Sequence, residues 1–159
     1  MNIAPTIQDY LAAQQITYEV LSHPRTMTSS ASAESAHLPG KSVAKAVVVE
    51  DDRGYVLAVL PSTYHLQFSA LERELHRSGL RLATEPELDR LFPDCQPGAV
   101  PPLGKPYGLA TIVEEDLAAQ PEIFFEAGDH EHLVHLTQAE FVRLTCDSPC
   151  AHFSRATPA

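Results

Sequence analysis

Lysine and cysteine are scarce in this sequence, with three of each among 159 residues. The odd number of cysteines, without a Cys-x-x-Cys pair, argues against a disulfide framework and against a structural zinc site. No apolar run is long enough to span a membrane. The N-terminal residues also lack the basic segment and apolar core of a signal peptide. We therefore expect a cytoplasmic protein with no membrane partner.

Positive charge is also scarce, because 11 Lys and Arg residues face 21 Asp and Glu residues, for a net charge of -10. Broad binding to nucleic acid needs many cationic contacts to phosphate, so we expect no DNA partner. A local basic pocket stays possible. The three lysines, Lys41, Lys45 and Lys105, fall in two short segments with glycine and proline, PGKSVAK and PPLGKPYG.

The length is that of one domain, and we expect residues 1–159 to form it, with a frayed tail at 147–159. Periodicity and punctuation predict helices at about 6–15, 29–37, 66–79, 84–92 and 137–146. They predict strands at about 17–23, 43–50, 54–60, 80–84, 109–115, 122–128 and 128–137. This order favours an α+β fold with a mixed, largely antiparallel, barrel-like β-sheet and helices packed outside.

Two local features sharpen this prediction. The strands at 43–50 and 54–60 flank a turn at Gly54 and are almost continuously apolar, which is typical of a central hairpin covered on both faces. Polar residues at helix starts predict caps: Thr6 as an N-cap, and capping boxes at Thr84-x-x-Glu87 and Thr137-x-x-Glu140.

Lys45 lies inside the first strand of this hairpin, where an unpaired ammonium is costly to bury. One interpretation is an edge-strand lysine that reaches solvent or blocks edge pairing. The other is a lysine at the mouth of a cleft, acting on phosphate as a point charge or as a tuned amine. The small neighbours Ser42, Ala44 and Ala46 fit a ligand and tight packing equally well. Lys41 stands at the entry of the strand.

The segment PDCQPGAVPPLGKPYG, residues 93–108, contains five prolines and three glycines. Prolines fix φ and remove donors, so the remaining amides and carbonyls are held in a set geometry. Such a loop, with Gly98 and Gly104 around Pro101-Pro102, can recognise a small polar group through its backbone. The alternative is a rigid crossover between a helix and the next strand.

The histidines do not make a convincing metal site. His130 and His132 are two apart on a predicted strand and share one face, whereas His135 points to the other. Catalytic zinc uses three protein ligands, and no cysteine pair completes this one. No GxSxG, P-loop, GxGxxG or HExxH motif is present. Cys95 has no basic neighbour that would make it a nucleophile.

Three segments together resemble one known family. HPRTMTSSASAESAHLPGKSVAKAVVVEDDRGYVLAVLPS, FPDCQPGAVPPLG and FFEAGDHEHLVHLTQAEFVRL are similar, in order and spacing, to the YbaK/prolyl-tRNA-synthetase-associated domain family. The resemblance covers nearly the whole chain. It implies a free-standing trans-editing deacylase, since no synthetase segments accompany it. Such an enzyme hydrolyses the ester between a wrong amino acid and the tRNA 3′ end, and so protects translation fidelity.

The resemblance also implies site residues. The family's strand lysine corresponds to Lys45, which we expect to be catalytic. Its GxxxP loop corresponds to Gly98-Ala99-Val100-Pro101-Pro102, and its Gly-x-His turn to Gly128-Asp129-His130. These segments, with Gly104 and Lys41 beside them, are the expected substrate-binding residues. Many members have Ser or Thr before the loop proline, and Pro101 in that place affects which amino acid is accepted.

The implied chemistry needs a positioned water and stabilisation of an oxyanion, with no cofactor or metal. Lys45 would hold the terminal phosphate or polarise the carbonyl. The loop at Gly98 would bind the α-ammonium and carbonyl by backbone groups, with His130 as a wall of the pocket. The tRNA's vicinal hydroxyl would assist the water. Steric exclusion of a larger amino acid can exceed the ~1–3 kcal/mol that a missing methylene provides.

Two other functions stay open. The same pocket could belong to a catalytically weak module that binds a nucleotide or the tRNA acceptor end. A metal-dependent hydrolase using His130 and His132 is the third hypothesis. In the favoured reading the partner is the aminoacylated tRNA 3′ end, and the low basic content favours delivery by an aminoacyl-tRNA synthetase or elongation factor. The amino acid, with alanyl, seryl and cysteinyl esters as candidates, is left open.

Overall fold

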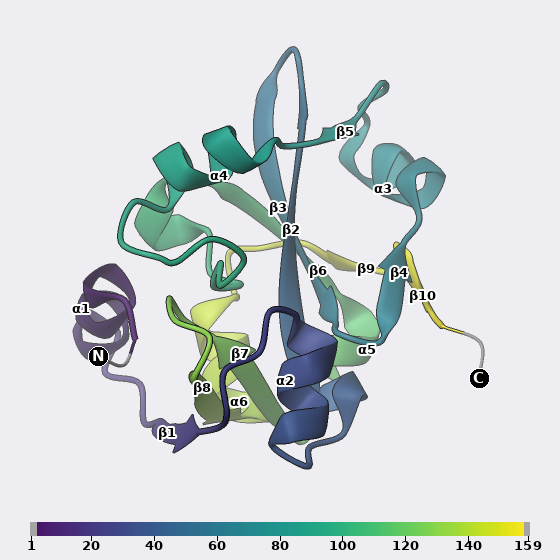
Figure 1. The fold of residues 1–159 in the computed structure, drawn as a ribbon. Helices are drawn as coiled ribbons and strands as arrows, with labels where there is room; N and C mark the ends of the chain where they lie inside the picture. The colour runs from purple at the N-terminus through teal and green to yellow at the C-terminus, as the bar shows by residue number, and fades with distance from the viewer. Residues whose placement is uncertain (1–2, 158–159) are drawn as a thin grey trace.

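The computed structural model describes residues 3–157 and has an α+β fold (Figure 1). The main sheet has eight strands in the order β1-β8-β7-β2-β3-β6-β9, with β5 paired beside β2. They are β1 (Glu19–Ser22), β2 (Val43–Asp51), β3 (Gly54–Pro61), β5 (Arg81–Leu82), β6 (Ala110–Glu114), β7 (Glu122–Glu126), β8 (His132–Thr137) and β9 (Cys150–Ala151). A two-stranded ribbon pairs β4 (Tyr64–Leu66) with β10 (Ser154–Ala156).

Short helices surround the sheet. They are α1 (Pro5–Ala13), α2 (Ser29–Ser35), α3 (Phe68–Leu75), α4 (Glu85–Leu91), α5 (Glu115–Ala118) and α6 (Gln138–Leu144), with 3-10 turns η1 (Gly40–Ser42) and η2 (Lys105–Tyr107). Figure 1 shows the β2–β3 hairpin through the centre, with α4 and α3 on either side of its tip and α2 near its base. Within residues 3–157, no helix is long and apolar enough to cross a membrane.

The predicted fold class is confirmed. Five strand pairs are antiparallel and three are parallel, so the sheets are mixed and largely antiparallel. Among the described residues, the hydrogen-bonded path of the main sheet ends at β1 and β9, so the barrel-like sheet is open. The predicted central hairpin is β2–β3, and its turn holds Gly54 at a φ of +122°, a conformation that favours glycine.

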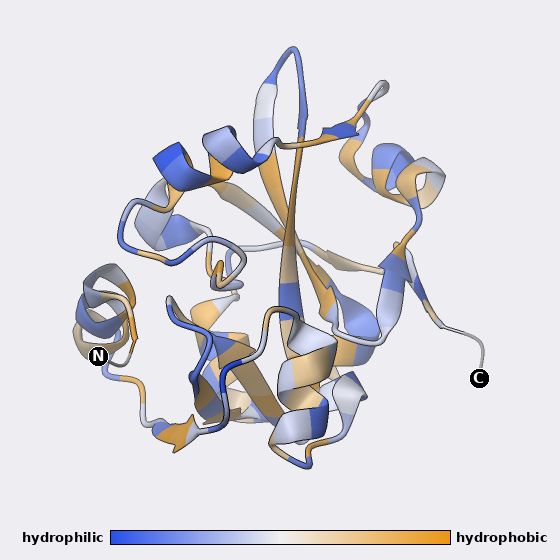
Figure 2. Cartoon of the chain, in the orientation of Figure 1, coloured by the Kyte–Doolittle hydropathy of each residue, from blue (hydrophilic) through white to orange (hydrophobic). Residues whose placement is uncertain are grey.

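The core lies on both faces of the sheet. Alternation along β2 sends Ala44 and Val48 to the larger cluster, under α1 and α6. On the other face Val43 belongs to a small cluster beneath α2, and Val49 to a cluster beneath α3. Lys45 stands on this second face, between those two clusters. The strands at the centre of the sheet are largely hydrophobic in Figure 2.

The C-terminal tail was predicted to be frayed, and for the described residues up to 157 that prediction is wrong. Strand β9 pairs with β6, β10 pairs with β4, and Phe153 between them is 1 % exposed. The buried Glu114 carboxylate holds this tail, because its Oε1 accepts hydrogen bonds from the amides of Phe153 and Ser154 at 3.0 Å each. Residues 158 and 159 lie outside the described part.

The helix caps follow the sequence in part. Thr84 and Glu87 form the predicted capping box. Helix α1 begins at Pro5 with Ala4 as its N-cap, so the prediction for Thr6 is wrong; the Thr6 amide instead donates to Asp94 Oδ2 at 2.9 Å.

At the start of α6, the Thr137 hydroxyl accepts from the Glu140 amide. The Glu140 carboxylate, however, accepts from the Thr17 amide at 2.8 Å rather than closing the predicted box. The Thr17 amide, distant in sequence, therefore takes the place of the Thr137 amide as the donor to Glu140.

Candidate functional site

Lys45 opens onto a polar cleft. The β2–β7 pairing ends at Ala44, one residue before Lys45, so the sheet divides where this side chain stands. The cleft has a volume of about 630 Å³ and is lined by Thr28, Ser29, Ser30, Lys45, Ser62, Thr63, His65 and Thr157. Hydroxyl groups thus surround a single lysine. This composition suits an anionic or strongly polar ligand.

The Lys45 ammonium has no counter-ion in this cleft. The side chain is half-buried, and among residues 3–157 no hydrogen bond or ion pair reaches it. Burial lowers the pKa of Lys45, because the charged form is desolvated without compensation. Lys45 is on a central strand rather than an edge strand, although β2 has no partner at Lys45 on the side of β7. A cation poised without a partner in an open cleft is the arrangement expected of a ligand-binding or catalytic lysine.

The proline-rich loop is fastened to the turn before β8. The Gln96 amide donates to the Gly128 carbonyl at 2.7 Å, and a hydrogen bond of 2.6 Å joins His130 Nε2 to the Pro97 carbonyl. Gly98 follows with a φ of +82°, and a Cβ there would lie 3.2 Å from His130 Cε1. Gly98 is exposed, whereas Ala99 is fully buried. The loop therefore presents one glycine to solvent on a rigid support.

Residues 26–30 connect this loop to the Lys45 cleft. The Thr26 amide donates to the His130 carbonyl at 3.1 Å. Next to it, the Met27 carbonyl lies 3.7 Å from the position that a Gly98 Cβ would take. A second cleft of about 370 Å³ opens here, lined by Met27, Glu85, Leu88, Asp89, Pro97 and Gly98. Since Thr28 lines the first cleft, one short segment separates the two.

A buried polar network that no local sequence pattern indicates holds that segment. Glu126 Oε1, at the end of β7, accepts from Ser32 Oγ at 2.6 Å and pairs with His23 Nε2 at 3.1 Å. Ser32 Oγ in turn lies 2.6 Å from Thr26 Oγ1. Burial raises the pKa of Glu126, and its Oε2 has no hydrogen-bond partner among the described residues. The network ties α2 and the segment before it to the sheet.

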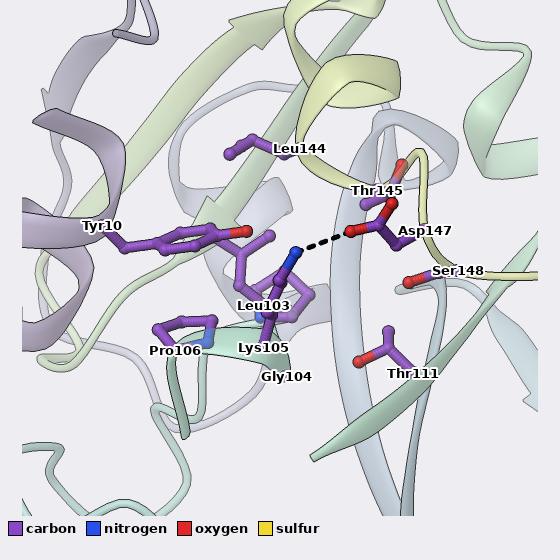
Figure 3. Close-up of a pocket in the computed structure, with 11 residues that line it drawn as sticks. Tyr10, Leu103, Gly104, Lys105, Pro106, Thr111, Leu144, Thr145, Asp147 and Ser148 are labelled. Atoms are coloured by element: carbon purple, nitrogen blue, oxygen red, sulfur yellow. Dashed lines mark hydrogen bonds and ion pairs between the residues drawn. The ribbon is translucent and has the colours of Figure 1, made fainter. Parts of the chain in front are cut away.

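Several predicted substrate-binding residues do not reach either cleft. Lys41 is exposed on η1 and lines neither cleft. Pro102 and Gly104 face the opposite side of the loop, where Figure 3 shows a cavity beside Tyr10. That cavity measures about 20 Å³, room for one water and too little for an aminoacyl group. A Cβ on Gly104 would collide with Thr111, so this glycine permits close packing.

The histidine geometry differs from the prediction. Strand β8 begins at His132, so His130 lies in the preceding turn and the two do not share a strand face. His132 Nδ1 pairs with Asp129 Oδ2 at 2.7 Å, and His130 is 1 % exposed. Among residues 3–157, the grouping with metal-ligand spacing is Glu114, Asp116 and His152, not these two. Its Glu114 carboxylate already holds the C-terminal tail.

The cysteine prediction can be compared with the structure as well. Burial raises the pKa of Cys95 to about 11, so its thiol stays protonated at neutral pH. A thiol in this state is a poor nucleophile, which agrees with the absence of a basic neighbour in the sequence. The candidate functional groups of the two clefts are therefore the Lys45 ammonium and the backbone around Gly98.

Comparison with known proteins gives the following. The family model described as "Aminoacyl-tRNA editing domain" matches residues 23–144. A solved candidate trans-editing enzyme for prolyl tRNA synthetase superposes with a TM-score of 0.83 at 24% identity, over 98% of this chain and 100% of that one. The hypothetical protein APE2540 gives a TM-score of 0.83 at 21% identity, over 94% and 99%.

One longer chain contains the same fold. A candidate signal transduction protein from Marinobacter aquaeolei VT8 has a TM-score of 0.77 at 19% identity, over 94% of this chain and 30% of that one. Among curated proteins, none matches this chain. At these identities the solved structures show a shared fold, and the family model carries the functional argument.

Proposed function

The chain belongs to the aminoacyl-tRNA editing domain family, and from that premise we propose that it is a trans-acting deacylase that hydrolyses the ester of mischarged tRNA. The observation that carries this proposal is Lys45, a half-buried lysine without a counter-ion in a hydroxyl-lined cleft. A structural lysine would be paired or extended into solvent. The similarity in fold to a candidate trans-editing enzyme supports action in trans.

The reaction needs one water and no protein nucleophile. Water attacks the ester carbonyl carbon, the carbonyl electrons move to its oxygen, and the bond to the ribose oxygen then breaks. The proton lost by the water passes to that leaving ribose oxygen, and the vicinal ribose hydroxyl assists the transfer. The products are a free amino acid and uncharged tRNA. The developing oxyanion is where a fixed positive charge lowers the barrier most.

The two clefts divide the work in this proposal. Lys45 binds the terminal phosphate or the developing oxyanion in the first cleft. The aminoacyl group enters the second cleft beside Gly98, where the α-ammonium meets backbone carbonyls such as that of Met27. The buried His130 keeps the loop in place through the Pro97 carbonyl and does not transfer a proton. We assign Pro102 and Gly104 to support of the loop rather than to substrate contact.

The test is deacylation of a panel of mischarged tRNAs by wild-type protein, Lys45→Ala and Lys45→Met. Removing one preorganised oxyanion donor lowers kcat by about 10²–10³-fold in other enzymes, and we expect a loss of that size. Lys105→Met is the matched control, because Lys105 is exposed and pairs only with the exposed Asp147. Wild-type release that survives in Lys45→Met would refute the assigned role.

The alternative is a binding module with the same pocket, favoured by the fact that no side chain among residues 3–157 forms a hydrogen bond or ion pair with Lys45. It predicts no release from any substrate, yet binding of an uncharged acceptor end that Lys45→Met weakens. Metal dependence is tested in the same assay, and we expect turnover to be unchanged by a chelator. Delivery by a synthetase or elongation factor is tested by co-purification, and recovery of neither would count against it.

A further inference from the structure

The β4–β10 ribbon forms a wall of the Lys45 cleft. His65 on β4 lies directly opposite Arg155 on β10, and directly opposed residues project from the same face of an antiparallel pair. The ribbon is extended by Thr157, whose amide and hydroxyl both donate to the Thr63 carbonyl, at 2.9 and 2.7 Å. Thr63, His65 and Thr157 all line the cleft that contains Lys45. The same ribbon therefore contributes residues to the Lys45 cleft and also contains Arg155.

A third cleft continues along the same ribbon. It has a volume of about 330 Å³ and is lined by Gln67, Ser69, Ala70, Arg73, His152, Phe153, Ser154 and Arg155. The Gln67 amide donates to the Phe153 carbonyl at 2.8 Å, which joins the start of α3 to the tail. We call this cleft the ribbon groove. Its walls are α3 on one side and the C-terminal strand on the other.

The ribbon groove contains two arginines free to bind a ligand. Arg73 and Arg155 are exposed, and within residues 3–157 neither forms an ion pair or a side-chain hydrogen bond. By contrast, Arg77, Arg81 and Arg143 all pair with carboxylates. Positive charge is scarce in the sequence as a whole, because 11 Lys and Arg residues face 21 Asp and Glu residues. Arg73 and Arg155 line one groove, on the same ribbon that forms a wall of the Lys45 cleft.

The third basic group of the groove is already used. His152 Nδ1 lies 3.0 Å from Glu114 Oε2, and its Nε2 lies 2.8 Å from Glu115 Oε2. The Asp116 carboxylate lies 3.8 Å from His152 Nδ1, and the three carboxylates raise the pKa of His152 and more than neutralise its charge. The groove's net attraction for an anion therefore comes from Arg73 and Arg155, with Ser69 and Ser154 as hydroxyl donors.

We infer that the ribbon groove binds the phosphodiester backbone of the single-stranded 3′ end whose last nucleotide occupies the Lys45 cleft. This inference rests on the proposed function and adds a path for the strand. Arginine matches phosphate oxygens with paired donors, and such contacts position a strand without reading its sequence. In this arrangement Lys45 and the two arginines supply three cations to one strand. An acidic protein thereby holds one short strand and repels the rest of the RNA.

The experiment uses an RNA hairpin with a tRNA-like single-stranded 3′ end, and the same hairpin made blunt. Its variant is Arg73→Ala/Arg155→Ala. The control Arg53→Ala/Arg90→Ala removes the same charge at two exposed arginines that line none of these clefts. Binding is measured against salt concentration, and deacylation kinetics are measured on the charged tRNA. Melting temperatures check that every variant folds.

For the groove variant we expect about tenfold weaker binding of the overhang hairpin, typical of two exposed charge contacts. The slope of log K against log salt should become shallower by about 1.4, at about 0.7 for each single-strand phosphate contact. The value of kcat/KM should fall in proportion to binding while kcat at saturation is unchanged. The control should bind like wild type, and blunt RNA should bind weakly to all three proteins.

The outcomes separate the two proposals. A groove variant that binds the overhang as the control does overturns the inference, and wild-type deacylation in the same samples would leave the proposed function standing. Conversely, arginine-dependent binding without release of any amino acid would keep the groove and refute the deacylase. Wild-type protein that fails to prefer the overhang over the blunt hairpin also overturns the inference.

Discussion

Replacing Lys45 by methionine should stabilise the protein while lowering its turnover by about 10²–10³-fold. Lys45 lies on a strand face between two apolar clusters, and its side chain is half-buried without a partner among the described residues. Methionine has a similar length, no charge to desolvate and a flexible apolar chain that suits such a gap. Functional residues often carry a stability cost of this kind. The side chain is partly in contact with solvent, so the gain is modest.

We expect the free energy of unfolding to rise by about 0.5–1 kcal/mol at neutral pH, a discounted value for a partly solvated charge. For a chain of this size, the melting temperature then rises by about 1–4 °C. The pH dependence has a definite sign. Because the folded pKa is lowered, the unfolded chain binds more protons between that pKa and the ordinary value of 10.5. Wild-type stability therefore rises with pH through this window, and the advantage of methionine disappears above it.

The assay is thermal and denaturant unfolding of wild type, Lys45→Met and Lys41→Met at neutral pH and again above pH 10. Lys41 is an exposed lysine on the same segment, so Lys41→Met controls for the loss of one positive charge from an acidic protein. Its effect should stay within about 0.5 kcal/mol. A lower melting temperature for Lys45→Met than for Lys41→Met would refute the reasoning, since it would show that the Lys45 ammonium is paired in the folded protein.

Three further predictions follow from the same geometry. Gly98→Ala should lower activity and reduce the free energy of unfolding by about 1–2 kcal/mol, because φ is +82° and the new Cβ would press on His130. A denaturant titration measures the loss, and unchanged stability would contradict this prediction. In a pH–rate profile corrected for spontaneous hydrolysis, turnover should fall at a lower pH than 10.5, as Lys45 loses its proton. Phe153→Ala should cost about 3–5 kcal/mol in the same titration, whereas a frayed tail would predict none.

The sequence predicted best what depends on near neighbours. The β2–β3 hairpin, its Gly54 turn and the Thr84–Glu87 capping box are local features, and all three form. The fold class followed from the order of these local elements. Strand alternation also placed Lys45 opposite Ala44 and Ala46, on the face that meets the cleft.

What the sequence missed depends on distant partners. His23 and Ser32 contact Glu126, from which they are separated by 103 and 94 residues of sequence. No local sequence pattern indicates either contact. The tail at Ser154 is ordered by Glu114, which lies 40 residues earlier. The segment after the Gly128-Asp129 turn predicted a strand that includes His130, but β8 begins at His132 and a buried hydrogen bond joins His130 Nε2 to the Pro97 carbonyl. Tertiary hydrogen bonds overrode local preference in each case.

The candidate site combines a fixed frame with a single unpaired charge. Hydrogen bonds join Gln96 to Gly128, His130 to Pro97 and Thr26 to His130, so the wall beside Gly98 cannot widen easily. Lys45 is outside this frame, because the pairing of β2 with β7 stops one residue before it. Under the proposed function, selection of the amino acid by size would rest on the loop, and the chemistry would rest on the strand. A rigid wall can exclude a larger side chain more strongly than it can favour a smaller one, which suits an enzyme that must spare correctly charged tRNA.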